Sequence, residues 1–168
     1  ASNGYTLNAA NEIEGFLFNG PDAERRYHET NKFEYVNTGG YYHSLPGDTL
    51  RQFIDTTAEV QRAMGFENEK DHPEVAPSQF EINYCYSDVV NAADQIQIYK
   101  LVCRQVATRM GLTASFLPKP VVGVNGSGMH TNVSITKNGK NLFWDPKGEE
   151  KMSKFAWQFV DRILTHGN

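Results

Sequence analysis

The chain has 168 residues, of which 39% are hydrophobic and 21% charged, and its formal net charge is −4 at pH 7. This length allows one domain with a buried core, and the composition is typical of a folded globular protein. The acidic balance argues against a general nucleic-acid partner, and no apolar run approaches the ~20 residues that span a bilayer. The two cysteines, Cys85 and Cys103, match no metal or redox spacing, so we expect free thiols. Because the N-terminus has no basic and apolar leader, we expect a cytoplasmic protein without a membrane partner.

The first predicted element is a strand over residues 12–18 (EIEGFLF), which ends at the turn signal of residues 19–22. Period-two alternation places four residues on one face of this strand: Glu12, Glu14, Phe16 and Phe18. Residues 23–45 are polar, aromatic and glycine-bearing, and we predict a loop with short extended pieces there.

A helix is predicted over residues 48–64, with Asp48 as its N-cap and Gly65 at its end. Two extended segments follow, at 66–75 and 79–86. In the second segment the alternation puts three polar side chains on one face: Gln79, Glu81 and Asn83.

The longest predicted helix covers residues 88–110, and Asp88 is its candidate N-cap. Residues 117–123 contain two prolines and are therefore expected to form a loop or a sheet edge. A strand over 128–135 follows, which turns at Asn138-Gly139, and a last helix begins near Ser153. Strands with one polar and one apolar face indicate an antiparallel sheet covered on one side, so we predict an α+β fold.

Glu12 and Glu14 are the first candidates for chemistry. Carboxylates two residues apart on a strand stand ~7 Å apart along it, and strands disfavour glutamate. The pair therefore indicates either a bound cation or an edge strand that faces solvent, and by itself it is more typical of the second.

A second acidic cluster is formed by Glu74 and Glu81 on adjoining extended segments, with His72 beside them. Close like charges repel by a few kcal/mol per pair at an effective dielectric constant of ~20. Such a cluster persists if its members are dispersed, protonated or bound to a metal, and hard oxygen ligands suit Mg²⁺ or Mn²⁺. His72 itself is more typical of a structural histidine than of a ligand.

The glycine-rich segment 124–130 (VNGSGMH) permits close approach of the backbone to a ligand, but it lacks the ending of a P-loop. His130 shares a strand face with Asn132 and Ser134, where it is either a metal ligand or an exposed histidine. A glycosidase-type carboxylate pair stays open as an alternative, although nothing selects an acid and a nucleophile.

Four motifs in order resemble type I glutamine synthetases. EIEGFLF (12–18) is similar to the family's E-x-E-F-F-L-F, and HPEVAPSQFEI (72–82) to H-H-E-V-A-P-G-Q-H-E-I. AADQIQIYK (92–100) resembles the start of the family's long helix, and FLPKPVVGVNGSGMH (116–130) resembles F-M-P-K-P-x-x-G-x-N-G-S-G-M-H. The likeness runs from about residue 5 through the whole chain and implies part of that family's catalytic domain, a curved antiparallel sheet with packed helices.

The resemblance implies two sites for Mg²⁺ or Mn²⁺. The ion nearer the amino-acid substrate would be held by Glu14, Glu74 and Glu81. The ion that bridges the ATP phosphates would be held by Glu12 and His130.

It also implies roles in catalysis and substrate binding. Tyr41 would help to form the ammonium pocket and His72 would contact the phosphate side, so the implied catalytic residues are Glu14, Glu74, Tyr41 and His72. Glutamate would be bound by Asn125 and Gly126. ATP would be contacted by Glu69, Tyr86, Asn132 and Ser134.

The implied reaction joins ammonia to L-glutamate through γ-glutamyl phosphate, with ATP as co-substrate, in an enzyme whose subunits form a dodecamer. Residues 1–168 would be a partial catalytic domain without the family's N-terminal domain and the last part of the catalytic domain. We therefore expect this polypeptide alone to lack ligase activity. The alternatives are a γ-glutamyl ligase for another amine, such as a polyamine or ethanolamine, and a synthetase-like protein without catalysis.

Departures from the motifs accompany the resemblance, and three of them bear on the site. Pro73 stands where the family has a histidine, and Gly15 stands where it has an aromatic residue. Asn132 stands where many members have a second histidine. We expect the first two to affect packing and the third to affect the nucleotide pocket.

Overall fold

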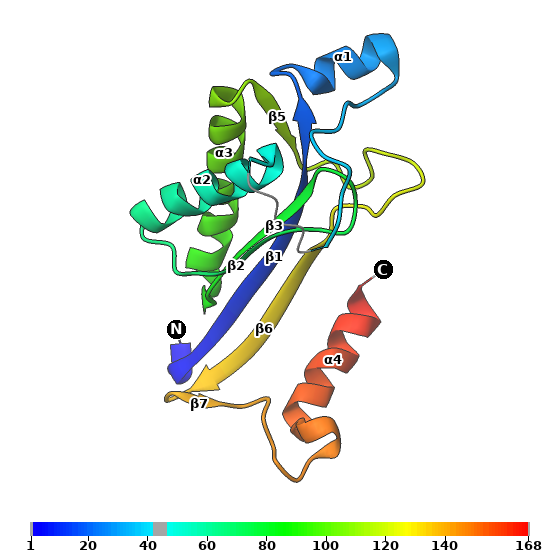
Figure 1. Ribbon diagram of the computed structural model, residues 1–168. Coiled ribbons are helices and arrows are strands. Elements are labelled where there is room, and N and C mark those ends of the chain that lie inside the picture. The colour runs from blue at the N-terminus through cyan, green and yellow to red at the C-terminus, as the bar shows by residue number, and fades with distance from the viewer. Residues whose placement is uncertain (1, 42–46, 168) are drawn as a thin grey trace.

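The computed structural model describes residues 2–41 and 47–167, and in them a sheet of seven strands is accompanied by four α-helices (Figure 1). The strands are β1 (Tyr5–Asn19), β2 (Asn68–Pro73), β3 (Gln79–Tyr84), β4 (Ser87–Asp88), β5 (Leu112–Ser115), β6 (Met129–Lys137) and β7 (Lys140–Asn141). The helices are α1 (Ala23–Thr30), α2 (Thr49–Ala63), α3 (Val89–Arg109) and α4 (Lys154–His166). All strand pairs are antiparallel, in the order β2-β3-β1-β6-β7, with β4 and β5 also paired to β1. The predicted α+β fold is confirmed.

The sheet is built around β1, its longest strand. The first part of β1, up to Ile13, pairs with β6, and the part from Glu14 onward pairs with β3 and then β5. The chain leaves β5 opposite Phe16 and enters β6 opposite Ile13. Residues 116–128 therefore form a loop that leaves and rejoins the sheet beside Glu14 (Figure 1).

Three predicted helices are present as α2, α3 and α4: the first two begin at the predicted caps Asp48 and Asp88, and the third begins at Ser153, near which its start was predicted. The side chains of Asp48, Asp88 and Ser153 accept hydrogen bonds from backbone N–H groups of the first helical turn. Such a cap contributes ~1 kcal/mol, which is why these starts can be located from sequence.

The predicted loop over 23–45 is wrong for residues 23–30, which form α1, and its residues 42–45 lie outside the described part of the chain. Helix α1 buries only Ala23, so it has no apolar stripe to indicate a helix. It is held locally by a salt bridge of 2.8 Å from Arg25 to Asp22, and the Ala23 N–H donates to Thr113 Oγ1 of β5. The short strand β5 was not predicted either.

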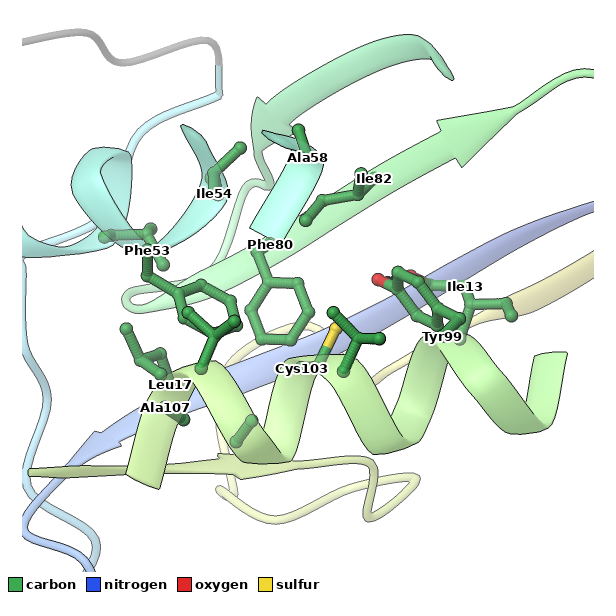
Figure 2. Close-up of a cluster of buried hydrophobic side chains, with 14 of the residues drawn as sticks. Ile13, Leu17, Phe53, Ile54, Ala58, Phe80, Ile82, Tyr99, Cys103 and Ala107 are labelled. Atoms are coloured by element: carbon green, nitrogen blue, oxygen red, sulfur yellow. Dashed lines mark hydrogen bonds between the residues drawn. The ribbon is translucent and has the colours of Figure 1, made fainter. Parts of the chain in front are cut away.

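The main core lies between the sheet and helices α2 and α3 (Figure 2). Ile13 and Leu17 of β1 and Phe80 and Ile82 of β3 point toward these helices, as the alternation predicts. The opposite face of β1 forms a second, smaller cluster, which contains Phe16, Phe18, Ala23 and Ala76. The face that carries Glu12 and Glu14 is therefore polar at its centre and apolar toward the end of β1.

Gly15 makes room for an aromatic side chain from the neighbouring strand. It lies opposite Phe80 on β3, and a Cβ at this position would stand 2.7 Å from Phe80 Cζ and 3.1 Å from Phe116 Cε1. The motif that the chain resembles has its aromatic residue on β1 and a histidine on β3. Here the aromatic volume comes from Phe80, so Gly15 and Phe80 are complementary departures.

Tyr99 of α3 ties the helix to β1 between the two glutamates. Its fully buried hydroxyl donates a hydrogen bond of 3.0 Å to the carbonyl oxygen of Ile13. Burial holds the pKa of Tyr99 well above its usual range, so the hydroxyl keeps its proton as a donor. A bond of this kind contributes ~1 kcal/mol and fixes β1 where its pairing changes from β6 to β3.

Helix α4 runs alongside β6 and packs loosely against it (Figure 1). Of its residues only Ala156 is buried, whereas Ile163 and Leu164 are 57% and 75% exposed. A hollow of about 430 Å³ separates α4 from Thr131 and Val133 of β6.

In the described ranges no helix is both long and apolar enough to cross a membrane. The cysteines are free, as predicted, with Cys103 buried in the core and Cys85 half-buried.

Candidate metal and nucleotide site

The strand register brings most of the candidate ligands onto one face of the sheet, which we call the carboxylate face. Glu14 of β1 lies opposite Glu81 of β3, and Glu81 lies opposite His72 of β2. On the other edge of β1, Glu12 lies opposite His130 of β6. Antiparallel partners project from the same face with Cβ atoms ~5 Å apart, so the pairing alone gathers these five side chains.

His72, Glu74 and Glu81 form the closest group, since each offers one ligand atom within 4.8 Å of the others. The distances are 3.7 Å from His72 Nδ1 to Glu74 Oε1 and 3.7 Å from His72 Nε2 to Glu81 Oε2. His72 and Glu81 are buried, and Asn83 Nδ2 donates to Glu81 Oε1 at 2.9 Å. The remaining carboxylate oxygen of Glu81 is thereby directed toward the histidine.

Glu74 lies directly after β2, and its pKa is raised above the ordinary value of a glutamate. Burial raises the pKa of Glu74, and repulsion from Glu81 and Glu14 raises it further. The hydrogen bond that Glu74 accepts from the Val75 N–H lowers this pKa, but by less than burial raises it. A carboxyl group that is costly to ionise beside two others indicates a place where a cation would be favoured.

The raised pKa of Glu74 predicts how stability depends on pH. A carboxyl group whose pKa is higher in the folded chain contributes stability below its ordinary value near 4.5, and this contribution is lost as the pH rises through the folded pKa. In the metal-free full-length protein we expect Glu74→Gln to raise the Tm at pH 7 by a few °C and to remove this loss. Thermal unfolding between pH 4 and 8 with a chelator measures the effect.

Glu59→Gln, on the exposed face of α2, is the matched control for this comparison. Saturating Mg²⁺ should reverse the order, because only the wild-type carboxylate gains from the cation. If the Tm of the wild type and the Tm of Glu74→Gln depended on pH in the same way, the raised pKa of Glu74 would be contradicted.

Glu14 is held by the loop that rejoins the sheet beside it. Its Oε2 accepts hydrogen bonds from the Gly128 N–H at 2.8 Å and from Gln79 Nε2 at 2.9 Å. A Cβ at Gly128 would stand 2.9 Å from His130 Nε2 and 3.1 Å from Glu14 Oε1. A side chain at 128 would therefore displace both candidate ligands from these positions.

Glu12 lies on the more open side of β1. Asn132 of β6 donates from Nδ2 to Glu12 Oε1 at 3.2 Å, and His130 is exposed beside it. Many members of the resembled family have a histidine at this position. Here Asn132 donates a hydrogen bond to the Glu12 carboxylate, a contact that the sequence did not indicate.

The candidate nucleotide residues lie farther along the same face. Asn8 of β1 pairs with Ser134 of β6 on one edge and with Asp88 of β4 on the other. Tyr86, just before β4, is 69% exposed and lines a hollow of about 200 Å³ together with Cys85. By the ~3.3 Å rise per residue, this end of the face is ~13 Å from Glu12.

Glu69 belongs to the same region. It lies where the β2–β3 register shifts between Asn68 and Lys70, and its carboxylate contributes, after desolvation, to the raised pKa of Cys85. Ser134 and Tyr86 thus lie next to the part of β1 around Asn8. Glu69 lies on the edge strand β2, and Asn132 lies nearer Glu12.

The candidate substrate residues surround the buried group at its other side. The Tyr41 ring lies edge-on to the His72 ring, with centroids 5.4 Å apart, and Tyr41 is 54% exposed. Asn125 and Gly126 lie on loop 116–128, where Gly126 packs so closely on Pro118 that a Cβ would stand 2.6 Å from its carbonyl oxygen. Asn125 is exposed on this loop.

Gln79 and Asn83 were not assigned a role from the sequence, although both contact candidate ligands. The alternation in residues 79–84 already placed them on the face of Glu81, which was the available signal. Their partners could not be predicted, because they come from the register of β1 with β3 and from the course of loop 116–128.

The sequence of the chain is similar to those of glutamine synthetases from several organisms. A glutamine synthetase of Clostridium saccharobutylicum is 42% identical over 164 residues, which are 96% of this chain and 35% of that protein. A glutamine synthetase of Methanosarcina mazei is 40% identical over 166 residues, which are 97% of this chain and 35% of that protein. The chain thus spans 35% of the length of both relatives.

Solved structures show the same architecture. Apo GmaS without ligand superposes with a TM-score of 0.80 at 29% identity, over 98% of this chain and 38% of that chain. The cryo-EM structure of Plasmodium falciparum glutamine synthetase has a TM-score of 0.80 at 26% identity, over 96% of this chain and 36% of that chain. The family model "Glutamine synthetase, catalytic domain" matches residues 1–168. With a buried carboxylate group on the sheet, motifs in family order and these matches, the chain belongs to the glutamine synthetase catalytic-domain family.

Proposed function

We propose that the full-length protein is an ATP-dependent glutamate–ammonia ligase and that residues 1–168 form part of its catalytic domain. The observation that carries this proposal is the register of β1, which sets Glu14 against Glu81 and Glu12 against His130 on one face. Family membership supports the reaction, and the geometry supports the assignment of residues.

The donor set fits Mg²⁺ or Mn²⁺. Glu14, Glu74 and Glu81 offer hard carboxylate oxygens, and the pKa of Glu74 is raised by burial and then by repulsion from the other two. These three glutamates would hold one ion, and Glu12 with His130 would hold the second. Bound there, the ions would neutralise the phosphoryl oxygens and orient the reacting groups.

The chain's own residues would position the substrates. Asn125 and Gly126 on loop 116–128 would bind glutamate beside Glu14, so that its γ-carboxylate faces the γ-phosphate of ATP. Attack would give γ-glutamyl phosphate and ADP, and ammonia would then displace phosphate. Tyr41 and His72 border this position, and their ring contact would shape the ammonium side of the site.

ATP would lie along the carboxylate face toward Asn8. Its phosphates would face Glu12 and His130, and its adenine would reach the hollow beside Tyr86. Contacts to ATP would come from Glu69, Tyr86, Asn132 and Ser134. We further propose a cytoplasmic homo-oligomer, a dodecamer in the full-length protein, whose other regions supply the rest of the site.

An ADP-release assay on the full-length protein tests the proposal. With Mg²⁺, ATP and glutamate, we expect ADP release to depend on ammonium and to be accompanied by equimolar glutamine. Parallel reactions replace ammonium with ethanolamine or a polyamine, and reactions without glutamate serve as controls.

Each other outcome selects a different function. Turnover with ethanolamine or a polyamine but not with ammonium would replace the proposal by a γ-glutamyl-amine ligase. No nucleotide turnover with any amine would leave a binding or regulatory protein. Glutamine formation by residues 1–168 alone would overturn the view that this part of the chain needs the remainder.

A further inference from the structure

Gln79 is a buried polar side chain on the carboxylate face that bonds through both ends of its amide. It is 1% exposed, at the start of β3. Its Nε2 donates to Glu14 Oε2 at 2.9 Å and to the Gly126 carbonyl at 2.8 Å, and its Oε1 accepts the Ala76 N–H at 3.2 Å. Both N–H donors and the carbonyl acceptor of the amide are therefore used, and the partners come from three separate segments.

These bonds determine which oxygen of Glu14 is available. Oε2 accepts two N–H groups, from Gln79 and from Gly128. Oε1 lies on the side of His130, since both atoms approach the same point above Gly128. A carboxylate with one oxygen held by two donors loses its rotational freedom and presents the other oxygen in a fixed direction.

The same amide also restrains loop 116–128. Gly126 is clasped between Gln79 Nε2 and Pro118, and the neighbouring Ser127 N–H donates to the Pro118 carbonyl at 2.8 Å. A shift of Gln79 would therefore move Glu14 and the Gly126 carbonyl together.

We propose that Gln79 is a positioning residue that couples the cation-facing oxygen of Glu14 to the substrate-binding loop. The proposal rests on the function proposed above for Glu14 and Gly126. According to this proposal, the Gln79 amide influences both the affinity of the site for the divalent ion and the position in which glutamate binds. Loss of the amide should weaken both, whereas a residue important only for folding would lower stability alone.

Gln61 of α2 provides a matched control. It is also a fully buried glutamine, and its Oε1 accepts a hydrogen bond of 3.1 Å from Asn68. Within the described residues its Nε2 has no hydrogen-bond partner. Methionine at either position keeps the length of the side chain and removes its donors.

The test compares Gln79→Met, Gln79→Glu and Gln61→Met in the full-length protein. Mn²⁺ binding is followed by the EPR signal of the free ion, and KM and kcat are measured with glutamate as the varied substrate. We expect Gln79→Met to weaken Mn²⁺ binding by about 10–100-fold and to raise KM for glutamate more than it lowers kcat. Gln61→Met should leave both constants unchanged, even if its Tm falls equally.

Gln79→Glu is isosteric with the wild type, so it allows the test to be made even if Gln79→Met does not fold. It removes the two donors and sets a carboxylate against Glu14, so Mn²⁺ binding should fall at least as far. Wild-type affinity and KM in either folded Gln79 variant, or equal losses in Gln61→Met, would overturn the proposal. If the wild type lacks ligase activity, the proposed function fails, while the Mn²⁺ affinities still decide the role of Gln79.

Discussion

Replacing Glu81 by glutamine in the full-length protein should lower kcat/KM for glutamine formation by about 10²–10³-fold. Glu81 is 7% exposed, faces Glu14 across the strand pair and is oriented by Asn83 and His72. Glutamine keeps the shape of the side chain but removes the charge that would hold the ion. A bound ion stabilises transferring phosphoryl oxygens by several kcal/mol, and about 3–4 kcal/mol corresponds to the stated factor.

The measurement is steady-state ADP release at saturating Mg²⁺, with glutamate varied. Glu59→Gln, which removes an equal charge from the exposed surface of α2, is the control and should retain wild-type kinetics. Because the variant has lost a ligand rather than its fold, its Tm without metal should not fall. A Glu81→Gln enzyme with wild-type kcat/KM would remove this glutamate from the metal site.

Truncation of Phe80 to alanine should produce the largest loss of stability, about 3–5 kcal/mol. Phe80 is fully buried, and its ring lies 4.8 Å from that of Phe53 and 6.0 Å from that of Phe116. It also occupies the space over Gly15 that a β1 side chain would need. Thermal unfolding of the full-length protein should show a fall in Tm of several °C.

The complementarity of positions 15 and 80 can be tested by a double-mutant cycle. Gly15→Phe alone should be destabilising, because its Cβ would stand 2.7 Å from Phe80 Cζ. Combined with Phe80→Ala, the new aromatic ring should fill the cavity, so that the double variant is more stable than the sum of the two changes predicts. Additive losses would show that the two departures from the motif are independent.

Much of the fold could be predicted because its signals are local. The caps at Asp48, Asp88 and Ser153 mark helix starts by bonds made within one turn. The alternation around Glu14 and Glu81 reflects a sheet with an apolar and a polar face. Helix α1 could not be predicted, because it buries a single side chain and depends on an ion pair and on Thr113 for its position.

The candidate site illustrates the same limit. Spacing alone made Glu12 and Glu14 more typical of a solvent-facing strand than of a site, and only motifs in family order changed that interpretation. The contacts of Gln79 lie 47 and 65 residues away in the chain and follow from register, which no single segment encodes. Residue types and faces could therefore be predicted, whereas hydrogen-bond partners could not.

The central place of β1 has a consequence for how the protein would respond if a chelator removed the ions proposed above. Since β1 is paired on both edges and both of its faces contribute to apolar clusters, its amide hydrogens should be among the slowest to exchange with solvent. We therefore expect the strand that carries Glu12 and Glu14 to open only when the whole domain unfolds. Chelation should speed exchange in loop 116–128 and leave β1 protected, so that rebinding of the ion meets two carboxylates already in register.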